Sequence, residues 1–179
     1  MIFHHTPIDG AYIVEVEKIE DDRGFFGRAF CADVFREKGI PFAVAQANVG
    51  CSRKKGTLRG LHYQLPPHEE AKLVRCIRGA VFDVIIDLRQ DSRSYGRWFG
   101  TELTANVPRL FHMPKGTAHG YLSLADDSEI FYLVSEFYTP GAERGIRWDD
   151  PAFAIQWPIT DNLRISEKDR AWPDFSLVC

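Results

Sequence analysis

Short segments rich in β-branched and aromatic residues recur along the chain, and Gly, Pro, Asn or Asp bounds each of them. Such segments are typical of β-strands separated by turns. Long helical segments, which a parallel α/β fold would place between its strands, are missing from the pattern. The sequence therefore predicts an all-β sandwich or barrel. The clearest strand candidates are Tyr12 to Val16, Leu73 to Ile77, Val81 to Leu88, Trp98 to Leu103, Arg109 to Met113 and Glu129 to Phe137.

Two short segments favour helices instead. One runs from Ala32 to Lys38 and is ended by Gly39, and the other lies near Ser166. The run RGAVFDV indicates a hairpin that turns at Gly79, and MPKGTAHGY indicates a tight turn that enters another strand. Hairpins punctuated by glycine in this way are typical of a jelly roll.

Length and charge narrow the class of protein. A chain of 179 residues with 45% hydrophobic content can bury one sizeable core, so we expect one domain over residues 1–179. The formal net charge of −3 argues against nucleic acid or an anionic membrane as the main partner, because both usually require a concentrated basic face. The N-terminal run MIFHHTPIDG has neither a basic leader nor a long apolar stretch, so we expect a cytoplasmic protein.

The cysteines and histidines do not form a metal-ligand pattern. No CxxC spacing occurs, and we expect free thiols rather than disulfides or a zinc site. The residue two positions after His62 is Gln64 rather than a second histidine, and His119 stands alone in AHGY. A metal centre needs three or four convergent ligands, so we expect no metal. The four cysteines are Cys31, Cys51, Cys76 and Cys179.

Ionisable residues are concentrated between Gly56 and Arg78. Alternate residues of a strand share a face, so strict alternation along GTLRGLHYQ places His62 and Arg59 on opposite faces. Along KLVRCIR, the same alternation groups Lys72 with smaller residues on the side that faces the barrel interior. A buried amine is costly unless it has a function.

A tyrosine on another predicted strand could meet these ionisable residues inside the barrel. Tyr132 in EIFYLVSEFY shares its side with Ile130 and Val134, and a buried tyrosine hydroxyl needs a hydrogen-bond partner. Taken singly, a strand histidine is more often structural, and an arginine is more often a solvated surface residue. Their convergence with Lys72 and Tyr132 in one small barrel makes a candidate acid/base pocket.

Seven runs of the chain carry a family resemblance. In order, they are DDRGFFGRAF, QANVGCSRKKGTLRGLHYQ, AKLVRCIRGAVFDVIIDLR, MPKGTAHGYLSL, FYLVSEFYTP, IRWDDPAFAIQWP and SEKDRAWP. They cover nearly the whole chain, and in this order they resemble the dTDP-4-dehydrorhamnose 3,5-epimerase family of sugar-nucleotide epimerases. The resemblance implies a cupin-type jelly-roll barrel with short flanking helices, a homodimer, and no metal or organic cofactor.

The resemblance also implies a reaction. In a nucleotide-linked 4-keto-6-deoxyhexose the protons on C3 and C5 lie α to the carbonyl, so their removal leaves an enolate that can be reprotonated from the opposite face. By resemblance, His62 is the base, Tyr132 the opposed acid and Lys72 the stabiliser of the developing oxyanion. Asp169 in SEKDR matches the family carboxylate that pairs with the histidine. From the residue pattern alone, Asp169 would be a helix cap or a surface carboxylate.

Other residues match family positions that contact the substrate. Arg59 resembles a ligand of the diphosphate, which its planar fork of N–H groups suits. The remaining residues of this kind are Arg23, Phe26, Gln46, Asn48, His119, Tyr138 and Arg170.

Two positions depart from the family pattern. Arg28 stands where many members have an acidic residue, and Leu133 stands where many have lysine. Neither touches the expected proton chemistry. They leave open whether the sugar is linked to dTDP, CDP or GDP, and sequence also leaves open whether C3, C5 or both are inverted.

The expected function is conversion of dTDP-4-dehydro-6-deoxy-D-glucose to dTDP-4-dehydro-L-rhamnose or a related reaction. It would serve deoxysugar biosynthesis for a cell-surface polysaccharide or a glycosylated metabolite. The alternatives are an epimerase acting at C3 or C5 only, a ketoisomerase on the same scaffold, a silent sugar-nucleotide-binding protein and a metal-dependent cupin oxygenase. A silent binding protein would be expected to lose His62, Lys72, Tyr132 or Asp169, and this chain keeps all four.

Overall fold

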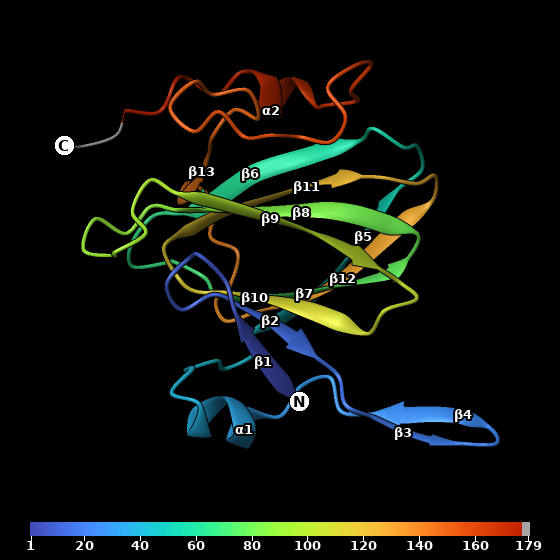
Figure 1. Cartoon of the computed structure of the whole chain (residues 1–179). Coiled ribbons are helices and arrows are strands. Elements are labelled where there is room, and N and C mark those ends of the chain that lie inside the picture. The colour runs from blue at the N-terminus through green and yellow to red at the C-terminus, as the bar shows by residue number, and fades with distance from the viewer. Residues whose placement is uncertain (177–179) are drawn as a thin grey trace.

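Two antiparallel sheets face each other and form the body of the protein (Figure 1). The computed structural model describes residues 1–176, and both sheets lie within this range. One sheet has six strands, in the order β1 (Ile2–His5), β2 (Tyr12–Glu15), β10 (Arg109–Met113), β7 (Lys72–Arg78), β12 (Ser128–Val134) and β5 (Gln46–Ser52). The other has five, in the order β13 (Glu143–Gly145), β6 (Leu58–Gln64), β11 (Thr117–Ser123), β8 (Ala80–Asp87) and β9 (Trp98–Thr104).

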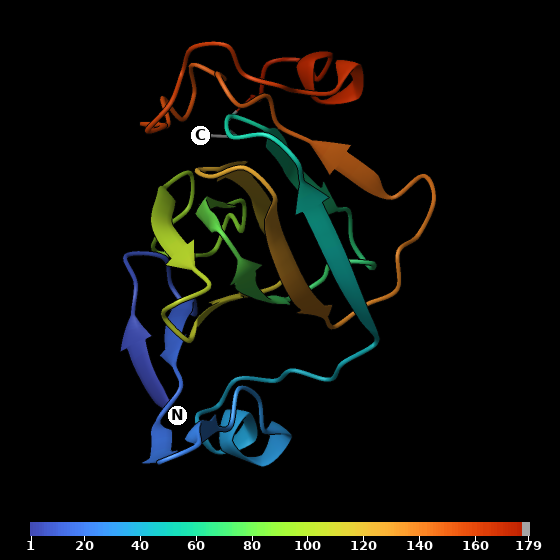
Figure 2. The same cartoon turned by 90° about the vertical axis from the view of Figure 1, so that its right-hand side faces the viewer.

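Successive strands repeatedly change sheets, as a jelly roll requires. The chain passes from β6 to β7, back to β8, and later from β10 to β11 and on to β12, and each step crosses between the two sheets. Two short helices flank this barrel, α1 (Ala32–Glu37) and α2 (Glu167–Arg170). Figure 2 shows α1 outside one layer and the C-terminal segment with α2 outside the other. The expected jelly roll with short flanking helices is therefore the observed fold.

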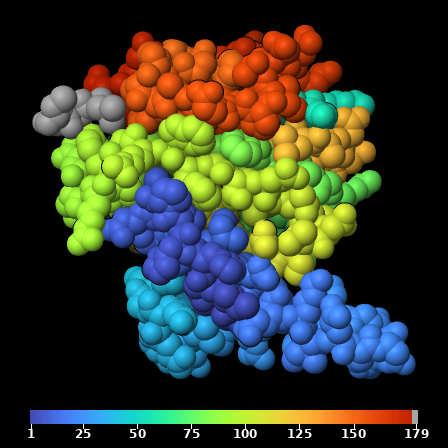
Figure 3. Space-filling view, viewed as in Figure 1, coloured from blue at the N-terminus to red at the C-terminus, as the bar shows by residue number. Residues whose placement is uncertain are grey.

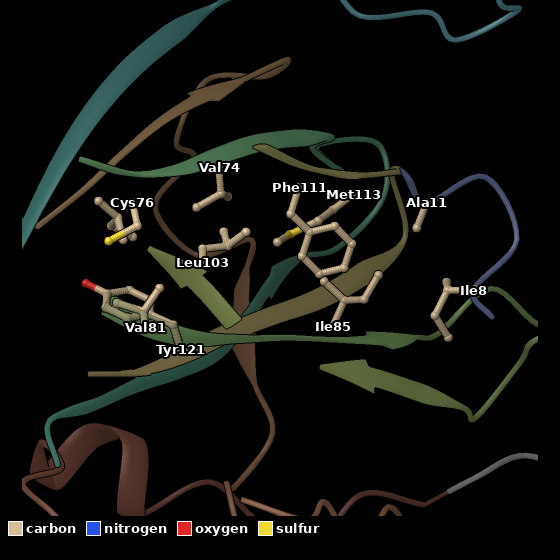
Figure 4. Packing of buried hydrophobic residues seen from close by; sticks show 11 residues of the cluster. Ile8, Ala11, Val74, Cys76, Val81, Ile85, Leu103, Phe111, Met113 and Tyr121 are labelled. Carbon is tan, nitrogen blue, oxygen red and sulfur yellow. The ribbon is translucent and has the colours of Figure 1, made fainter. Parts of the chain in front are cut away.

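The inward faces of the sheets bury a common core (Figure 4). Val74 and Phe111 project from the six-stranded sheet, and Val81 and Ile85 project from β8 in the opposite sheet; all four are fully buried. Each such side chain contributes about 1.5–3 kcal/mol relative to an exposed one. This burial explains why the strands are rich in β-branched and aromatic residues.

Chain segments also cover much of the outer faces. Phe153 and Trp157 of the C-terminal segment pack against Leu61 on the outside of the five-stranded sheet. Phe35 of α1 packs against Leu73 on the outside of the six-stranded sheet. Strands that are buried on both faces need apolar residues at nearly every position, which accounts for continuous runs such as VFDVIID.

A two-stranded hairpin projects away from the barrel (Figures 1 and 3). Its strands are β3 (Lys18–Asp21) and β4 (Gly24–Gly27), and they pair with each other only. The hairpin exposes Ile19, Phe25 and Phe26, of which Phe26 is 66% exposed. An isolated hairpin is marginally stable in water, so these apolar side chains mark a surface that suits a partner.

Most of the predicted elements are confirmed. Strands β2, β7, β8, β9 and β10 each end within one residue of the prediction, while β12 ends at Val134 rather than at Phe137. Helix α1 begins at Ala32 and ends before Gly39, and Ser166 caps α2 through its side chain. The tight turn after Met113 is also present, closed by a 2.8 Å hydrogen bond from the Thr117 hydroxyl to the Pro114 carbonyl.

The predicted hairpin at Gly79 is wrong. Strands β7 and β8 lie in different sheets and do not pair with each other. Gly79 has a φ of +70°, and a Cβ there would lie 2.6 Å from the Ser128 hydroxyl oxygen. That hydroxyl donates a 3.0 Å hydrogen bond to the Ala80 carbonyl. Gly79 therefore forms a corner between two sheets, which sequence does not distinguish from a hairpin turn.

Two further expectations concern bonds and membranes. Cys31, Cys51 and Cys76 are free cysteines, as predicted, and Cys179 lies outside the described residues. No helix within residues 1–176 is long and apolar enough to cross a membrane.

A histidine lies buried among aromatic rings beneath α1. His112 of β10 is 2% exposed, and its ring centroid is 5.8 Å from those of Phe35 and Phe42. Burial lowers the pKa of His112 to about 4, because a charged ring would lose its hydration there, and the nearby backbone of Gly10 opposes this only in part. The packing of α1 therefore requires the neutral ring.

Acid should destabilise the fold through this residue. The unfolded chain binds the proton near the ordinary histidine pKa of 6.5 and the folded chain near 4, so stability is lost as pH falls across that window. The wild-type protein should lose unfolding free energy between pH 7 and pH 4.5. In His112→Leu we expect this loss to be smaller by roughly 2–3 kcal/mol. Urea unfolding at both pH values measures this. The control His5→Gln changes an exposed histidine and should lose as much unfolding free energy at pH 4.5 as the wild type. If His112→Leu loses that amount too, His112 is not the cause of the acid sensitivity.

Candidate active site

A cleft of about 1000 Å³ lies between the inner side of the barrel and residues 163–170. Strands β5, β6, β7, β11, β12 and β13 contribute to its walls. Its volume is at the upper end of the range of small-molecule sites. Ten of the predicted site residues line it, namely Gln46, Asn48, Arg59, His62, Lys72, His119, Tyr132, Tyr138, Asp169 and Arg170.

His62 and Asp169 form a close pair within this cleft. The His62 Nε2 to Asp169 Oδ1 distance is 2.6 Å, and Asp169 is buried while His62 is half-buried. Ser166 accepts a 3.1 Å hydrogen bond from the Asp169 backbone N–H and so fixes the start of α2. Burial would raise the pKa of Asp169, but the hydrogen bond and charge of His62 and the Gly60 N–H outweigh it and lower that pKa. The carboxylate is therefore held ionised behind the imidazole.

The predicted separation of His62 from Arg59 is wrong, because β6 does not alternate strictly. Its pairing with β11 shifts register between the partners of His62 and Arg59, and Gly60 has a φ of +116°. A Cβ on Gly60 would lie 2.5 Å from the Gly120 Cα and 2.8 Å from the His119 carbonyl oxygen. The irregularity brings both Arg59 and His62 to the cleft, while Leu61 stays in the outer cluster.

Arg59 is held at the cleft by contacts with β5. Its guanidinium donates a 2.9 Å hydrogen bond to the Cys51 carbonyl and a 3.4 Å bond to the Ser52 hydroxyl. These bonds orient the fork, and the side chain stays partly exposed toward the cleft. A guanidinium in this arrangement can bind a phosphate oxygen.

Lys72 and Tyr132 occupy neighbouring strands in the cleft wall. Alternation holds along β7 from Lys72 to Cys76 and along β12 from Ile130 to Val134, since Val74, Ile130 and Tyr132 contribute to or pack on the inner core. Lys72 is buried and ion-paired with Glu70. Burial lowers the pKa of Lys72, and the charge of Glu70 opposes that change. Burial also raises the pKa of Tyr132, so its hydroxyl stays protonated and can donate a proton.

A second histidine–aspartate pair lies deeper. The His119 Nε2 to Asp83 Oδ1 distance is 2.6 Å, and both side chains are buried. Tyr121, two residues along β11, stacks on His119 with ring centroids 6.3 Å apart. Asp83 and Tyr121 were missed at the sequence level. Their signal was present, because a buried aspartate within the apolar run VFDVIID requires a partner.

Three charged residues outside the predicted set close the cleft near α2. Glu143 of β13 is ion-paired with Lys168, and the Tyr138 hydroxyl lies 3.4 Å from the Glu143 carboxylate. Arg164 pairs through its backbone with Gly56 and Leu58 and carries the C-terminal segment along the start of β6. Pairs such as Glu143 with Lys168 join residues far apart in sequence, so no local pattern could have found them.

The Trp172 ring lies directly on the backbone of Gly145. A Cβ on Gly145 would overlap the indole ring. Gly145 is also the β13 partner of His62 in the sheet register. The indole therefore anchors the end of α2 next to the strand that supports the histidine.

Arg23 and Phe26 lie outside this cleft, on the projecting hairpin. Arg23 is ion-paired with Asp21 at 2.5 Å, and its hydrogen bond to Asp21 raises the pKa of Arg23. Phe26 is exposed, and neither residue is among those that line the cleft. Their contact with substrate stays a prediction.

The two departures from the family pattern also lie away from the cleft walls. Leu133 points to the other side of β12 from Tyr132 and packs in the cluster beneath α1. Arg28 is exposed where the chain leaves the hairpin, next to Cys31. Among the described residues, no group of three or more His, Cys, Asp or Glu side chains is arranged to hold a metal ion.

Comparison with known proteins decides the family. Residues 5–176 match the model of the dTDP-4-dehydrorhamnose 3,5-epimerase family. A curated dTDP-4-dehydrorhamnose 3,5-epimerase of Methanothermobacter thermautotrophicus is 45% identical over 172 residues, which are 95% of this chain and 92% of that protein. The chain belongs to this family. It is thus an epimerase of the isomerase class, as the seven sequence runs predicted.

Two other relatives differ in the carbons that their names say they invert. A Legionella pneumophila dTDP-6-deoxy-D-glucose-3,5-epimerase, solved in complex with dTDP-4-keto-L-rhamnose, superposes with a TM-score of 0.88. It is 36% identical, and the match covers 98% of this chain and 99% of that one. A dTDP-4-dehydrorhamnose 3-epimerase of Streptomyces niveus is 39% identical over 91% of this chain and 78% of that protein. Identity alone therefore does not separate double from single epimerases.

The close approach at Gly60 gives a stability prediction for this epimerase. Gly24 has a similar φ of +126°, but a Cβ there would meet nothing within 4 Å, whereas one on Gly60 would meet the β11 backbone. We expect Gly24→Ala to cost about 1–2 kcal/mol from backbone strain. Gly60→Ala should cost at least about 2 kcal/mol more, because backbone atoms must move. Urea unfolding of both variants measures the difference, and equal losses would show that the contact with Gly120 is unimportant.

Proposed function

We propose that this protein is a cofactor-independent 3,5-epimerase of dTDP-4-dehydro-6-deoxy-D-glucose, and that residues 1–179 act as one domain. The observation that carries the proposal is the His62–Asp169 pair in the same cleft as Tyr132 and Lys72, in a chain of this family. The Legionella relative, solved with dTDP-4-keto-L-rhamnose, supports the choice of nucleotide and sugar.

The base in the proposed reaction is His62. A base must present a neutral nitrogen to the C–H bond and then carry the proton as an imidazolium ion. The Asp169 carboxylate, 2.6 Å from Nε2, fixes the ring orientation and stabilises that cation, which leaves Nδ1 for the sugar. The half-buried position of His62 lets substrate reach the ring.

The acid and the oxyanion stabiliser are Tyr132 and Lys72. When a proton leaves C3 or C5, negative charge develops on the oxygen at C4, and a nearby ammonium group lowers the energy of that enolate. The Tyr132 hydroxyl then delivers a proton to the opposite face of the carbon, which inverts it. Solvent then takes the proton from His62 and returns one to Tyr132, so each inversion balances and the carbon skeleton is neither oxidised nor reduced.

The nucleotide end of the substrate would bind at the charged rim of the cleft. We assign the diphosphate to Arg59 and Arg170, and Lys168 adds positive charge beside them. Gln46 and Asn48 on β5 offer amide groups to the base or sugar, and the exposed ring of Tyr138 offers a stacking surface. His119 lies deeper, near the proposed position of the sugar.

We further propose a homodimer in which each hairpin reaches the cleft of the partner. Arg23 and Phe26 match family substrate contacts, yet they lie outside the cleft of their own chain. The hairpin also exposes Ile19 and Phe25, which an interface would bury. A two-fold axis would let both hairpins make the same exchange. Within the cell, we assign the enzyme to the cytoplasm and to deoxysugar biosynthesis.

Solvent exchange tests the chemistry. NMR of dTDP-4-keto-6-deoxyglucose with the enzyme in deuterated water should show deuterium entering at both C3 and C5. His62→Ala should reduce this exchange by at least about 100-fold, because the general base is lost, while dTDP affinity stays near wild type. His5→Ala changes an exposed histidine outside the cleft and should leave exchange unchanged.

Other outcomes of that experiment separate the alternatives. Exchange at one carbon only would identify a single epimerase like the Streptomyces niveus relative. Exchange with a CDP- or GDP-linked sugar in place of the dTDP sugar would change the substrate assignment. Tight binding of the sugar nucleotide with no exchange would make the chain a binding protein, and near-normal turnover in His62→Ala would remove that residue from the mechanism.

A mixing experiment tests the exchanged hairpin. Neither His62→Ala nor the double variant Arg23→Ala/Phe26→Ala should epimerise well alone. In a mixed dimer, one site combines an intact His62 with the intact hairpin of the other subunit. Statistical mixing should therefore restore about a quarter of wild-type turnover. No gain on mixing, with subunit exchange verified by mass spectrometry, would show that the hairpin does not act across the dimer.

A further inference from the structure

We propose that Glu70 is a positioning residue that holds the Lys72 ammonium group in the cleft where the oxyanion develops. This inference rests on the proposed function, because it concerns the group assigned there to the oxyanion. Nothing in the sequence pattern points to a role for Glu70. Its place in the structure assigns one.

The geometry joins Glu70 to Lys72 inside the cleft. The Glu70 carboxylate contacts the Lys72 ammonium group, and their side chains are only 16% and 8% exposed. Ala71, which lies between them, is fixed to Ser135 by two hydrogen bonds. The Ala71 N–H donates a 2.8 Å bond to the Ser135 hydroxyl, and the Ser135 N–H donates a 2.9 Å bond to the Ala71 carbonyl. Both Glu70 and Lys72 line the cleft.

This pair opposes the effect of burial on Lys72. A buried ammonium group loses hydration, and that loss lowers the pKa of Lys72. The charge and hydrogen bond of Glu70 act in the other direction, and Glu143 adds a weaker contribution. Lys72 can stabilise an enolate only as a cation, so Glu70 maintains the form that the reaction needs.

Glu143 also lines the cleft, and its charge acts on Lys72 in the same direction as that of Glu70 but more weakly. The remaining titratable side chains of the cleft are Arg59, His62, His119, Tyr121, Tyr132, Tyr138, Arg164, Lys168, Asp169 and Arg170.

The pair Glu70→Gln and Glu69→Gln tests the proposal. Both variants remove one negative charge from adjacent positions, but Glu69 does not line the cleft. The alkaline limb of the kcat/KM profile should move to lower pH by about one unit in Glu70→Gln, because Lys72 loses its proton more readily without the carboxylate. It should stay at its wild-type position in Glu69→Gln. In Glu70→Asp it should move less than in Glu70→Gln, because the charge remains but lies farther from the ammonium group. Affinity for dTDP, which lacks the sugar, should stay unchanged in all variants.

A second measurement does not depend on turnover. NMR of the Lys72 side chain, labelled with carbon-13 at Cε, should report a lower pKa in Glu70→Gln than in wild type and Glu69→Gln. An unchanged Lys72 titration together with an unchanged alkaline limb would overturn the inference. If Glu70→Gln does not fold, the comparison of wild type with Glu70→Asp decides, since a longer gap to the ammonium must lower the Lys72 pKa. Absence of epimerisation by the wild-type enzyme would instead reject the proposed function while leaving the NMR result valid.

Discussion

The close approach of β6 and β11 at Gly60 and Gly120 is the constraint on which the rest of the site depends. A methyl group at either position would meet backbone or side-chain atoms of the other strand within 3.1 Å. The local irregularity turns Arg59 and His62 toward the cleft and leaves Leu61 on the outside. The outer cluster in turn holds the C-terminal segment, which carries Asp169 back to His62. Packing on one face of a sheet thus positions charge on the other.

Three carboxylates in or near the cleft each have a close partner. Asp169 lies with His62, Asp83 with His119, and Glu70 with Lys72. Removing the partner of such a carboxylate would leave a shielded negative charge uncompensated, which is strongly destabilising. Pairing also fixes each group before substrate arrives, so little reorganisation is needed when charge develops on the sugar. The contacts that offset the cost of burying these charged groups therefore also hold the groups in position for acid/base chemistry.

Sequence alone was enough to predict which side chains face inward where side chains alternate regularly along a strand. The inward side of Lys72 and Tyr132 followed from alternation alone, and β10 was predicted to the residue. The predictions failed at Gly60 and Gly79, because a glycine allows a bulge, a sheet-crossing corner or a hairpin turn, and only tertiary contacts select among them. The partners Asp169, Asp83 and Glu143 are distant in sequence from His62, His119 and Lys168, so their pairing required a family resemblance or the structure itself.

The position of Asp169 has a consequence for how the protein is made. Every strand of the described barrel precedes this residue in the chain, and the ribosome therefore synthesises His62 more than a hundred residues before the carboxylate that pairs with it. Until residues 146–170 emerge, Leu61 and its neighbours on the outer sheet face have no cover. Docking of this last segment, with Trp172 on Gly145, buries that face and completes the dyad in the same event. The nascent barrel therefore lacks the complete His62–Asp169 pair until the outer face of its five-stranded sheet is covered.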